Sequence, residues 1–282
     1  MDTELDAFRE QSRETWDEMA AGWEARNKWM SEETGAVNDW ILEKVDPQSR
    51  ETILDIAAGP GDLGLRAAEL VGDGGHVLVT DFSPEMVAAA RRLGDGRGLT
   101  NVEYRVLDAE QMDLDDESVD RAVCRWGYML MADPAAALSE SKRVLHRGGP
   151  LAFAVWAAPE RNPWAGAPAK TLVERGHLPA PEPGAPGIFA LADPDRIRSL
   201  VEGAGFESPE LEEIPFEFNY KDFDDLWDSL VRLAGPLARA IKTLDEDERR
   251  ATREAIEASV APYRNENGSY TSPALCIGAL TR

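Results

Sequence analysis

Residues 53–64 read ILDIAAGPGDLG, an apolar run followed by a glycine-rich turn and the expected start of a helix. Glycine at such a turn lets backbone N–H groups approach a ligand closely, and a helix N-terminus adds free donors and a positive dipole. Asp81 stands at the end of the next expected strand, twenty residues beyond Gly61. A carboxylate there can accept a hydrogen bond from each ribose hydroxyl. The pattern therefore predicts a site for a cofactor that contains a nucleoside.

Strand and helix signals alternate around this turn. Apolar runs predict strands over residues 52–57, 76–80, 101–107, 119–124 and 151–156. Helical patterns between them cover residues 61–71, 83–93 and 134–145. Ser83 is a favoured N-cap, and Pro84 is favoured at the first helical position. Such alternation is typical of a doubly wound α/β fold with a Rossmann-like parallel sheet.

The whole chain divides by composition into four segments. We expect an N-terminal helical cover over residues 1–46, a cofactor-binding core over 47–156, a cap over 157–192, and a final segment over 193–282 that completes the sheet and adds further cap helices. The cover is predicted to hold two amphipathic helices. The proline-rich cap has one helical pattern, at residues 164–176. The last segment shows helical patterns at 194–204, 223–233 and 245–261 and strand patterns at 209–218 and 274–280. Pairing of the last two strands would make one edge of the sheet antiparallel.

Composition and charge exclude several classes of protein. The chain has 282 residues, of which 43% are hydrophobic and 29% charged, as in a globular protein. A formal charge of −23 argues against nucleic acid or an anionic membrane as a main partner. No apolar run approaches the ~20 residues of a membrane span, and the N-terminus does not resemble a signal peptide. Two cysteines without a CxxC spacing and three histidines predict no metal site and a cytoplasmic location.

Two further carboxylates favour S-adenosylmethionine over a dinucleotide. Asp55 lies near the end of the first expected strand, where it would repel a pyrophosphate but suit an ammonium group. The third expected strand ends at residues 108–110, Asp-Ala-Glu, where a side chain can bind the adenine amino group. A nicotinamide cofactor stays open as an alternative, because the glycines at positions 59, 61 and 64 also match the dinucleotide fingerprint.

Four ordered segments carry a resemblance to a known family. They are LDIAAGPG at residues 54–61, VTDFSPEMVAAAR at 79–91, VLDAEQMDLDDESVD at 106–120 and RVLHRGGPLAFAVW at 143–156. Together they resemble the class I S-adenosylmethionine-dependent methyltransferases, and within these the ubiquinone/menaquinone-type small-molecule branch. The resemblance covers roughly residues 50–156 and implies the seven-stranded fold of that class, with S-adenosylmethionine as the cofactor.

The resemblance also implies roles at the first turn. Asp55, Ala57 and Gly59 would surround the methionine moiety, and Gly61 would keep the turn tight. Ala57 departs from the family, which has its first turn glycine there, so we expect an ordinary backbone conformation at this residue. Arg147 replaces the family's proline before a double glycine, a surface change with little expected consequence.

The nucleoside half of the cofactor would contact the ends of the second and third strands. Asp81 would hold the ribose, with Phe82 and Met86 against the adenine. Asp108 and Ala109 would bracket the adenine edge.

Three tryptophans and an arginine complete the expected cofactor site. Arg125, after the fourth strand, would line the methionine part through its backbone, with Trp126 beside the transferred methyl group. Trp23 would fold over the cofactor from the N-terminal helices, since related enzymes place an aromatic residue there. Trp16 shares this expectation, and ordinary helix packing is the alternative for both.

The sequence indicates an acceptor site but no evident catalytic base. His177 in the cap and Tyr128 after the fourth strand are weak candidate bases, and the sequence favours a surface histidine and a packing tyrosine instead. Aromatic residues that can form an apolar acceptor wall, or simply a core, are Trp164, Phe189, Phe216, Phe218 and Trp227.

We therefore predict methyl transfer from S-adenosylmethionine to a small molecule, with O- or C-methylation of a planar or lipophilic metabolite favoured. Two alternatives remain at this point: an NAD(P)-dependent oxidoreductase, and a non-catalytic protein that keeps the cofactor fold. A nucleic-acid methyltransferase is disfavoured by the charge and by the sequence Arg125–Tyr128, which lacks the Asn/Asp-Pro-Pro-aromatic tetrad. Oligomeric state, pathway and the identity of the acceptor are not predicted.

Overall fold

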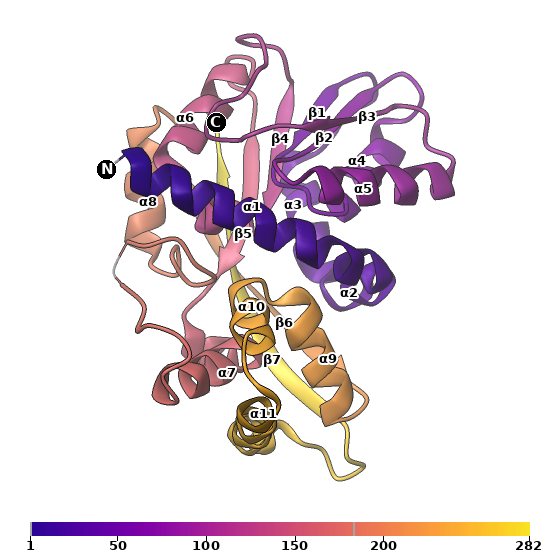
Figure 1. The fold of residues 1–282 in the computed structure, drawn as a ribbon. Helices are drawn as coiled ribbons and strands as arrows, with labels where there is room; N and C mark the ends of the chain where they lie inside the picture. The colour runs from indigo at the N-terminus through magenta and orange to yellow at the C-terminus, as the bar shows by residue number, and fades with distance from the viewer. Residues whose placement is uncertain (1, 183) are drawn as a thin grey trace.

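A seven-stranded mixed sheet flanked by helices forms the centre of the molecule (Figure 1). The structure is a computed structural model that describes residues 2–182 and 184–282. The strand order is β3-β2-β1-β4-β5-β7-β6. The strands are β1 (Thr52–Asp55), β2 (His76–Asp81), β3 (Val102–Val106), β4 (Arg121–Arg125), β5 (Leu151–Trp156), β6 (Glu210–Tyr220) and β7 (Tyr270–Thr281). This order confirms the doubly wound fold that the sequence predicts.

The sheet is parallel from β3 through β5 and antiparallel beyond it. Strand β1 lies between β2 and β4, and β5 pairs in parallel with β4. Strand β7 inserts antiparallel between β5 and β6. The expected antiparallel edge is therefore confirmed. The parallel arrangement brings the carboxyl ends of β1, β2, β3 and β4 to one edge, where open α/β sheets bind ligands.

The helices cover the sheet and continue beyond it. The N-terminal and core helices are α1 (Asp2–Ala25), α2 (Asn27–Glu33), α3 (Gly35–Val45), α4 (Asp62–Val71), α5 (Pro84–Arg97), α6 (Pro134–Val144) and α8 (Pro194–Gly203). The helices of the cap are α7 (Pro163–Glu174), α9 (Phe223–Leu233), α10 (Pro236–Lys242) and α11 (Glu246–Val260). Helix α3 packs on β4 to β7, whereas α4 and α5 pack along β1, β2 and β3.

The N-terminal segment contains three helices, so the expectation of two is wrong. The chain breaks at Arg26 and Thr34, where the sequence has no proline. Arg26 pairs with Asp225 of α9 at 2.8 Å, and the Thr34 hydroxyl accepts a hydrogen bond from Arg125 of β4 at 3.0 Å. Contacts with distant parts of the chain thus accompany these breaks, and local sequence does not reveal them.

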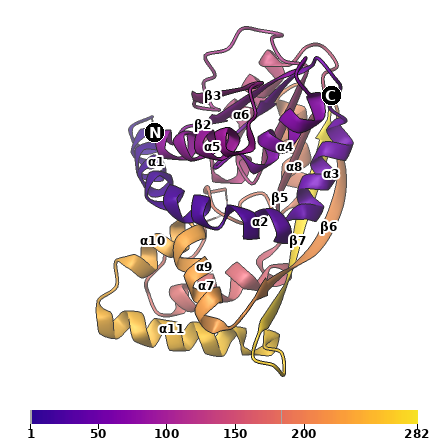
Figure 2. The ribbon, with the colours of Figure 1, turned by 90° about the vertical axis from the view of Figure 1, so that its right-hand side faces the viewer.

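The cap is built from the insert after β5 and from helices of the C-terminal segment. Strands β6 and β7 pair over their full length, to Tyr220 opposite Tyr270, whereas β5 pairs with β7 only up to Cys276. The hairpin therefore leaves the sheet as a two-stranded ribbon. Helices α7, α9, α10 and α11 lie beside this ribbon, below the sheet (Figure 2). Helix α10 was not predicted from the sequence; its seven residues are too few for a clear helical period.

Helix α1 crosses between the sheet and the cap (Figure 1). It packs against α5 of the core and α9 of the cap. Glu24 accepts two hydrogen bonds from Arg92 of α5, at 2.8 and 2.7 Å, and Thr15 accepts one from Arg239 of α10 at 2.8 Å. The N-terminal segment therefore connects the two halves of the molecule directly above the edge where the parallel strands end.

Two other sequence expectations concern membranes and cysteines. Among the helices that the structure describes, none is both long enough and apolar enough to cross a bilayer. Cys124 and Cys276 are free thiols, both fully buried in strands as expected. Burial raises the pKa of each thiol to about 12, so neither is a nucleophile near neutral pH.

Replacing Gly278 of β7 by alanine should destabilise the fold. A Cβ there would lie 2.7 Å from ring carbons of Trp40, which packs α3 onto the strand. Overpacking of this kind costs roughly 1–3 kcal/mol. Gly203→Ala is the matched control, because a Cβ at Gly203 meets nothing within 4 Å. Urea unfolding should show a lower midpoint only for Gly278→Ala, and equal midpoints would contradict the packing argument.

Candidate functional site

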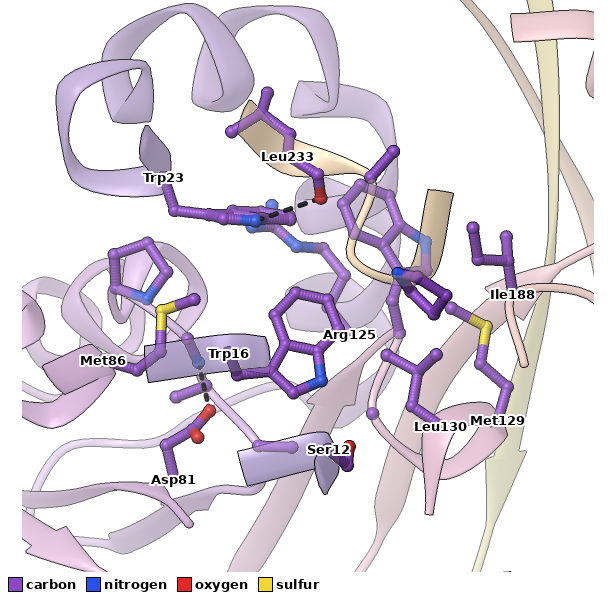
Figure 3. Close-up of a pocket in the computed structure, with 18 of the residues that line it drawn as sticks. Ser12, Trp16, Trp23, Asp81, Met86, Arg125, Met129, Leu130, Ile188 and Leu233 are labelled. Atoms are coloured by element: carbon purple, nitrogen blue, oxygen red, sulfur yellow. Dashed lines mark hydrogen bonds between the residues drawn. The ribbon is translucent and has the colours of Figure 1, made fainter. Parts of the chain in front are cut away.

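A deep cleft opens at the carboxyl ends of the parallel strands, between the sheet, α1 and the cap (Figure 3). Its lining residues come from α1, the turn after β1, the ends of β2 to β5, and the cap.

Asp55, the last residue of β1, supports the turn between β1 and α4. Its Oδ2 accepts a hydrogen bond from the Gly64 backbone N–H at 2.7 Å, and the side chain is 1% exposed. A Cβ at Gly64 would lie 2.6 Å from this oxygen, so the glycine allows the close approach. Burial raises the pKa of Asp55 to about 7, although Gly64 and Arg125 oppose the shift. Asp55 thus supports the turn and does not line the cleft, where contact with the cofactor was expected.

The turn itself runs through three left-handed residues. Ala57 has a φ of 51°, Gly59 of 56° and Gly61 of 81°. The expectation of an ordinary backbone conformation at Ala57 is therefore wrong. The position needs the conformation that glycine adopts readily, and alanine adopts it at a cost of about 1–2 kcal/mol. Gly61 lies beneath the turn, against Ala90 and Val79, whereas Ala57 and Gly59 line the cleft.

Asp81 faces the cleft from the end of β2. Its Oδ2 accepts from the Gly59 N–H at 2.9 Å (Figure 3). Its Oδ1 accepts from the Ser83 N–H, also at 2.9 Å. Burial raises the pKa of Asp81 to about 6, and the hydrogen bonds from Ser83 and Gly59 limit the rise. Each oxygen keeps a second lone pair for a ligand hydroxyl. The geometry fits a ribose diol.

The predicted adenine contacts lie on the same side of the cleft. Phe82 and Met86 line it beside Asp81, and Asp108 and Ala109 line it from the end of β3. Asp108 Oδ1 accepts from the Glu110 N–H at 2.9 Å, which fixes the loop. The structure therefore brings together the residues that the sequence assigned to the nucleoside half.

Helix α1 covers this half of the cleft. Trp16 and Trp23 both line it, with ring centroids 6.3 Å apart. The indole N–H of Trp23 donates to the Leu233 carbonyl at 3.2 Å (Figure 3). Arg9 donates twice to Glu110, at 3.0 and 2.7 Å. These contacts hold the helix over this half of the cleft.

Arg125 and Trp126 line the cleft at the end of β4. The Arg125 side chain is 7% exposed, and its guanidinium lies 4.7 Å from the Trp126 ring centroid. Trp126 has a φ of 63°, a left-handed conformation rare for a bulky residue. Its ring stacks on Trp156 with centroids 4.5 Å apart, and its N–H donates to Cys276 Sγ at 3.2 Å. The surrounding structure thus fixes a strained residue at the cleft, as occurs at functional sites.

The cap side of the cleft is an aromatic chamber. We use this name for the lining residues Trp29, Trp126, Trp156, Trp164, Phe218 and Tyr220. Trp156 and Trp164 lie 4.8 Å apart, and Trp164 and Phe218 lie 5.3 Å apart, centroid to centroid. Phe189, Phe216 and Trp227, also expected in an acceptor wall, do not line the cleft. Phe216 instead backs the chamber, 5.8 Å from Trp156.

The charged lining residues gather on the cofactor side. They are Arg9, Asp81, Asp108, Glu110 and Arg125. Among the described residues, the chamber and the cap helices around it contribute no Asp, Glu, His, Lys or Cys to the lining. Burial raises the pKa of Tyr220 well above its usual value, so its hydroxyl stays protonated near neutral pH and is not available to accept a proton from an acceptor.

Neither candidate base lies at the cleft. Tyr128 is fully buried, and its hydroxyl is 2.7 Å from Ser141 Oγ. His177 lies outside the cleft, with Nε2 2.7 Å from Glu248 Oε1 on α11. The packing explanation of Tyr128 therefore fits the structure. His177 is a half-buried partner of Glu248 rather than a free surface histidine, and neither residue is placed to act as a base in the cleft.

Sequence reasoning missed several lining residues from distant segments. They are Phe8, Arg9, Ser12, Trp29, Met30, Met129, Leu130, Met131, Ile188, Tyr220, Leu226, Ser229, Leu230, Leu233 and Pro236. Most are apolar positions of amphipathic elements, and the same pattern describes an ordinary core. The one available signal was the density of tryptophans in the first forty residues, at 16, 23, 29 and 40.

Comparisons with known proteins agree with this geometry. The family described as "Methyltransferase domain" matches residues 53–149. The chain is 30% identical over 209 residues to the demethylmenaquinone methyltransferase of Clavibacter sepedonicus, covering 69% of this chain and 82% of that one. It is 35% identical over 145 residues to the ubiquinone/menaquinone biosynthesis C-methyltransferase of Acidiphilium cryptum, covering 50% of this chain and 57% of that one. The chain thus spans little more than half the length of this second relative.

A solved structure supports the fold as well. Protein BH2331 of Bacillus halodurans C-125 superposes with a TM-score of 0.60 at 23% identity. The match covers 87% of this chain and 97% of that one.

Ala57→Gly should stabilise the protein slightly. The change removes about 1–2 kcal/mol of left-handed strain and costs about 0.4–1 kcal/mol in unfolded-state entropy. The matched control is Ala58→Gly at the neighbouring residue, whose φ is not positive. This variant should lose about 0.5–1 kcal/mol of its free energy of unfolding. Urea unfolding measures both. A loss for Ala57→Gly as large as for Ala58→Gly would show that the turn is not strained.

Proposed function

The chain belongs to the class I S-adenosylmethionine-dependent methyltransferase family, and on that premise we propose that it methylates a small planar or lipophilic molecule. The observation that carries the proposal is the division of one cleft into two parts. One part has the charged groups that fit S-adenosylmethionine, and the other is the uncharged aromatic chamber. An O- or C-methyl acceptor in the chamber would lie next to Trp126, where the two parts meet.

The residues of the chain supply binding and orientation. S-adenosylmethionine, when bound, supplies an activated methyl group on a sulfonium. Asp81 accepts from the ribose, Phe82 and Met86 pack on the adenine, and α1 closes over the turn. Fixing a donor and an acceptor in line contributes about 7–11 kcal/mol to lowering the barrier.

A side-chain base is not part of the proposal. A general base adds about 10²–10⁴-fold to a rate, less than orientation contributes. Among the described residues around the chamber, the lining offers no group that titrates near neutral pH. Any proton lost by the acceptor would therefore leave through the acceptor's own ionisation or through solvent.

The acceptor class rests on the chamber walls. Stacked and edge-on rings of Trp126, Trp156 and Trp164 favour a flat, apolar molecule. The names of the two relatives point to quinone-type acceptors for those proteins. The described walls of the chamber offer no counter-ion to an anionic acceptor such as nucleic acid. The net charge of −23 would also repel such an acceptor.

Calorimetric titration tests the proposed cofactor. S-adenosylmethionine and S-adenosylhomocysteine should bind, and NADH should not. Asp81→Asn should weaken the binding of both S-adenosyl compounds by about 10- to 100-fold, because it removes charge-assisted hydrogen bonds to the ribose. Binding of NADH alone would support the oxidoreductase alternative. Binding without methyl transfer to any member of a quinol and phenol panel would favour the non-catalytic alternative.

Cofactor affinity should fall as the pH falls through about 6, the raised pKa of Asp81. Above that pH the carboxylate accepts from both ribose hydroxyls, whereas below it a protonated oxygen acts as a donor instead. Titrations with S-adenosylhomocysteine from about pH 8 to about pH 5 measure the loss. Asp81→Asn is the control, and any pH dependence that remains in it belongs to other groups such as Asp55. Identical profiles for the two proteins would contradict the role of Asp81.

A further inference from the structure

A buried ion pair lies behind the cleft, where α3, α4 and β4 meet. Asp62, the first residue of α4, and Arg125, the last of β4, have side chains 1% and 7% exposed. Arg125 Nη1 lies 3.1 Å from Asp62 Oδ2. Burial opposes ionisation of Asp62, but Arg125 and neighbouring hydrogen bonds hold its pKa below the usual value. Both groups are therefore charged, and a buried charged pair needs further hydrogen bonds to be stable.

Asn38 of α3 supplies those hydrogen bonds to both ions. Its Nδ2 donates to Asp62 Oδ2 at 2.7 Å, and its Oδ1 accepts from Arg125 Nη1 at 2.6 Å. Thr34 Oγ1 accepts from the same Nη1 at 3.0 Å. Asn38 and Thr34 are both fully buried. An amide can serve a carboxylate and a guanidinium together because it carries a donor and an acceptor.

The arrangement leaves one side of Arg125 unused. The three hydrogen bonds that Arg125 donates, to Thr34, Asn38 and Asp62, all come from Nη1. Among the residues that the structure describes, none receives a hydrogen bond from Nε or Nη2, and the side chain lines the cleft. Because the guanidinium is planar and rigid, fixing Nη1 also fixes the direction of the other N–H groups.

We propose that Asn38 is a positioning residue for the cofactor site. By holding Asp62 and Arg125 together, it directs the unused N–H groups of Arg125 toward a carboxylate at the amino-acid end of the cofactor. A guanidinium is the side chain best suited to bind a carboxylate through two parallel hydrogen bonds. The inference rests on the proposed function, and it assigns Arg125 a side-chain role where a backbone contact was expected. It also makes the N-terminal segment a working part of the site.

Two ligands that differ in one half test this role. S-adenosylhomocysteine has the amino-acid end, whereas 5′-methylthioadenosine keeps the nucleoside and lacks that end. Asn38→Leu keeps the bulk of the side chain and removes both hydrogen bonds. It should weaken binding of S-adenosylhomocysteine by about 10- to 100-fold. Binding of 5′-methylthioadenosine should stay within about two-fold, because Asp81 and the adenine contacts are unchanged.

The controls separate positioning from loss of structure. Asp39→Asn changes the next residue, which is exposed and pairs only with Arg66 among the described residues, and it should leave both affinities unchanged. Thr34→Val is isosteric and removes one hydrogen bond, so it gives a second, milder test if Asn38→Leu does not fold. Thr34→Val should weaken binding of S-adenosylhomocysteine several-fold and leave binding of 5′-methylthioadenosine unchanged.

Each outcome decides between the alternatives. A loss confined to S-adenosylhomocysteine supports the inference. An equal loss for both ligands means that Asn38 is only structural, and unchanged affinities mean that Arg125 does not depend on it; either result overturns the inference. If the unmodified protein binds neither ligand, the proposed function fails and this inference fails with it.

Discussion

The hydrogen bonds from the β1–α4 turn to two buried carboxylates are the constraint on which the rest of the site depends. Asp55 accepts from Gly64 at the start of α4, and Asp81 accepts from Gly59 at the middle of the turn. Both carboxylates come from strand ends, so the sheet itself fixes the shape of the turn. Carboxylates buried this deeply have raised pKa values, and the N–H donors of the turn limit that rise. The charges and the loop conformation therefore stabilise one another.

The parallel half of the sheet was predictable because its signals are local. Each strand is a short apolar run, each crossover helix has its own period, and Ser83 caps α5 by accepting a hydrogen bond from the Met86 N–H, as its sequence indicates. The nucleoside side of the site followed from the same local pattern. Asp81, Phe82, Met86, Asp108 and Ala109 all line the cleft because each lies at or just beyond a strand end.

The cap and the chamber were not predictable to the same degree. The chamber residues come together from α2, the position after β4, β5, α7 and β6, so no window of sequence contains the chamber. Trp29 and Tyr220 lie almost two hundred residues apart, yet their ring centroids are 5.5 Å apart. Apolar periodicity identifies such residues as buried, but it does not distinguish a packed core from the wall of a cleft. The left-handed conformation of Ala57 was not predicted for another reason. Its neighbours impose this backbone angle, and an alanine at the position does not indicate it.

The placement of β7 has a consequence for how the chain assembles. Every other strand precedes β7 along the chain, yet β7 lies inside the sheet, between β5 and β6. Until residues 270–281 are available, β5 and β6 each present an open edge of unpaired N–H and C=O groups, which can pair with other chains. During synthesis the cofactor half of the sheet can form early, whereas the cap must wait for the last strand. A nascent chain is thus most exposed to aggregation just before β7 leaves the ribosome.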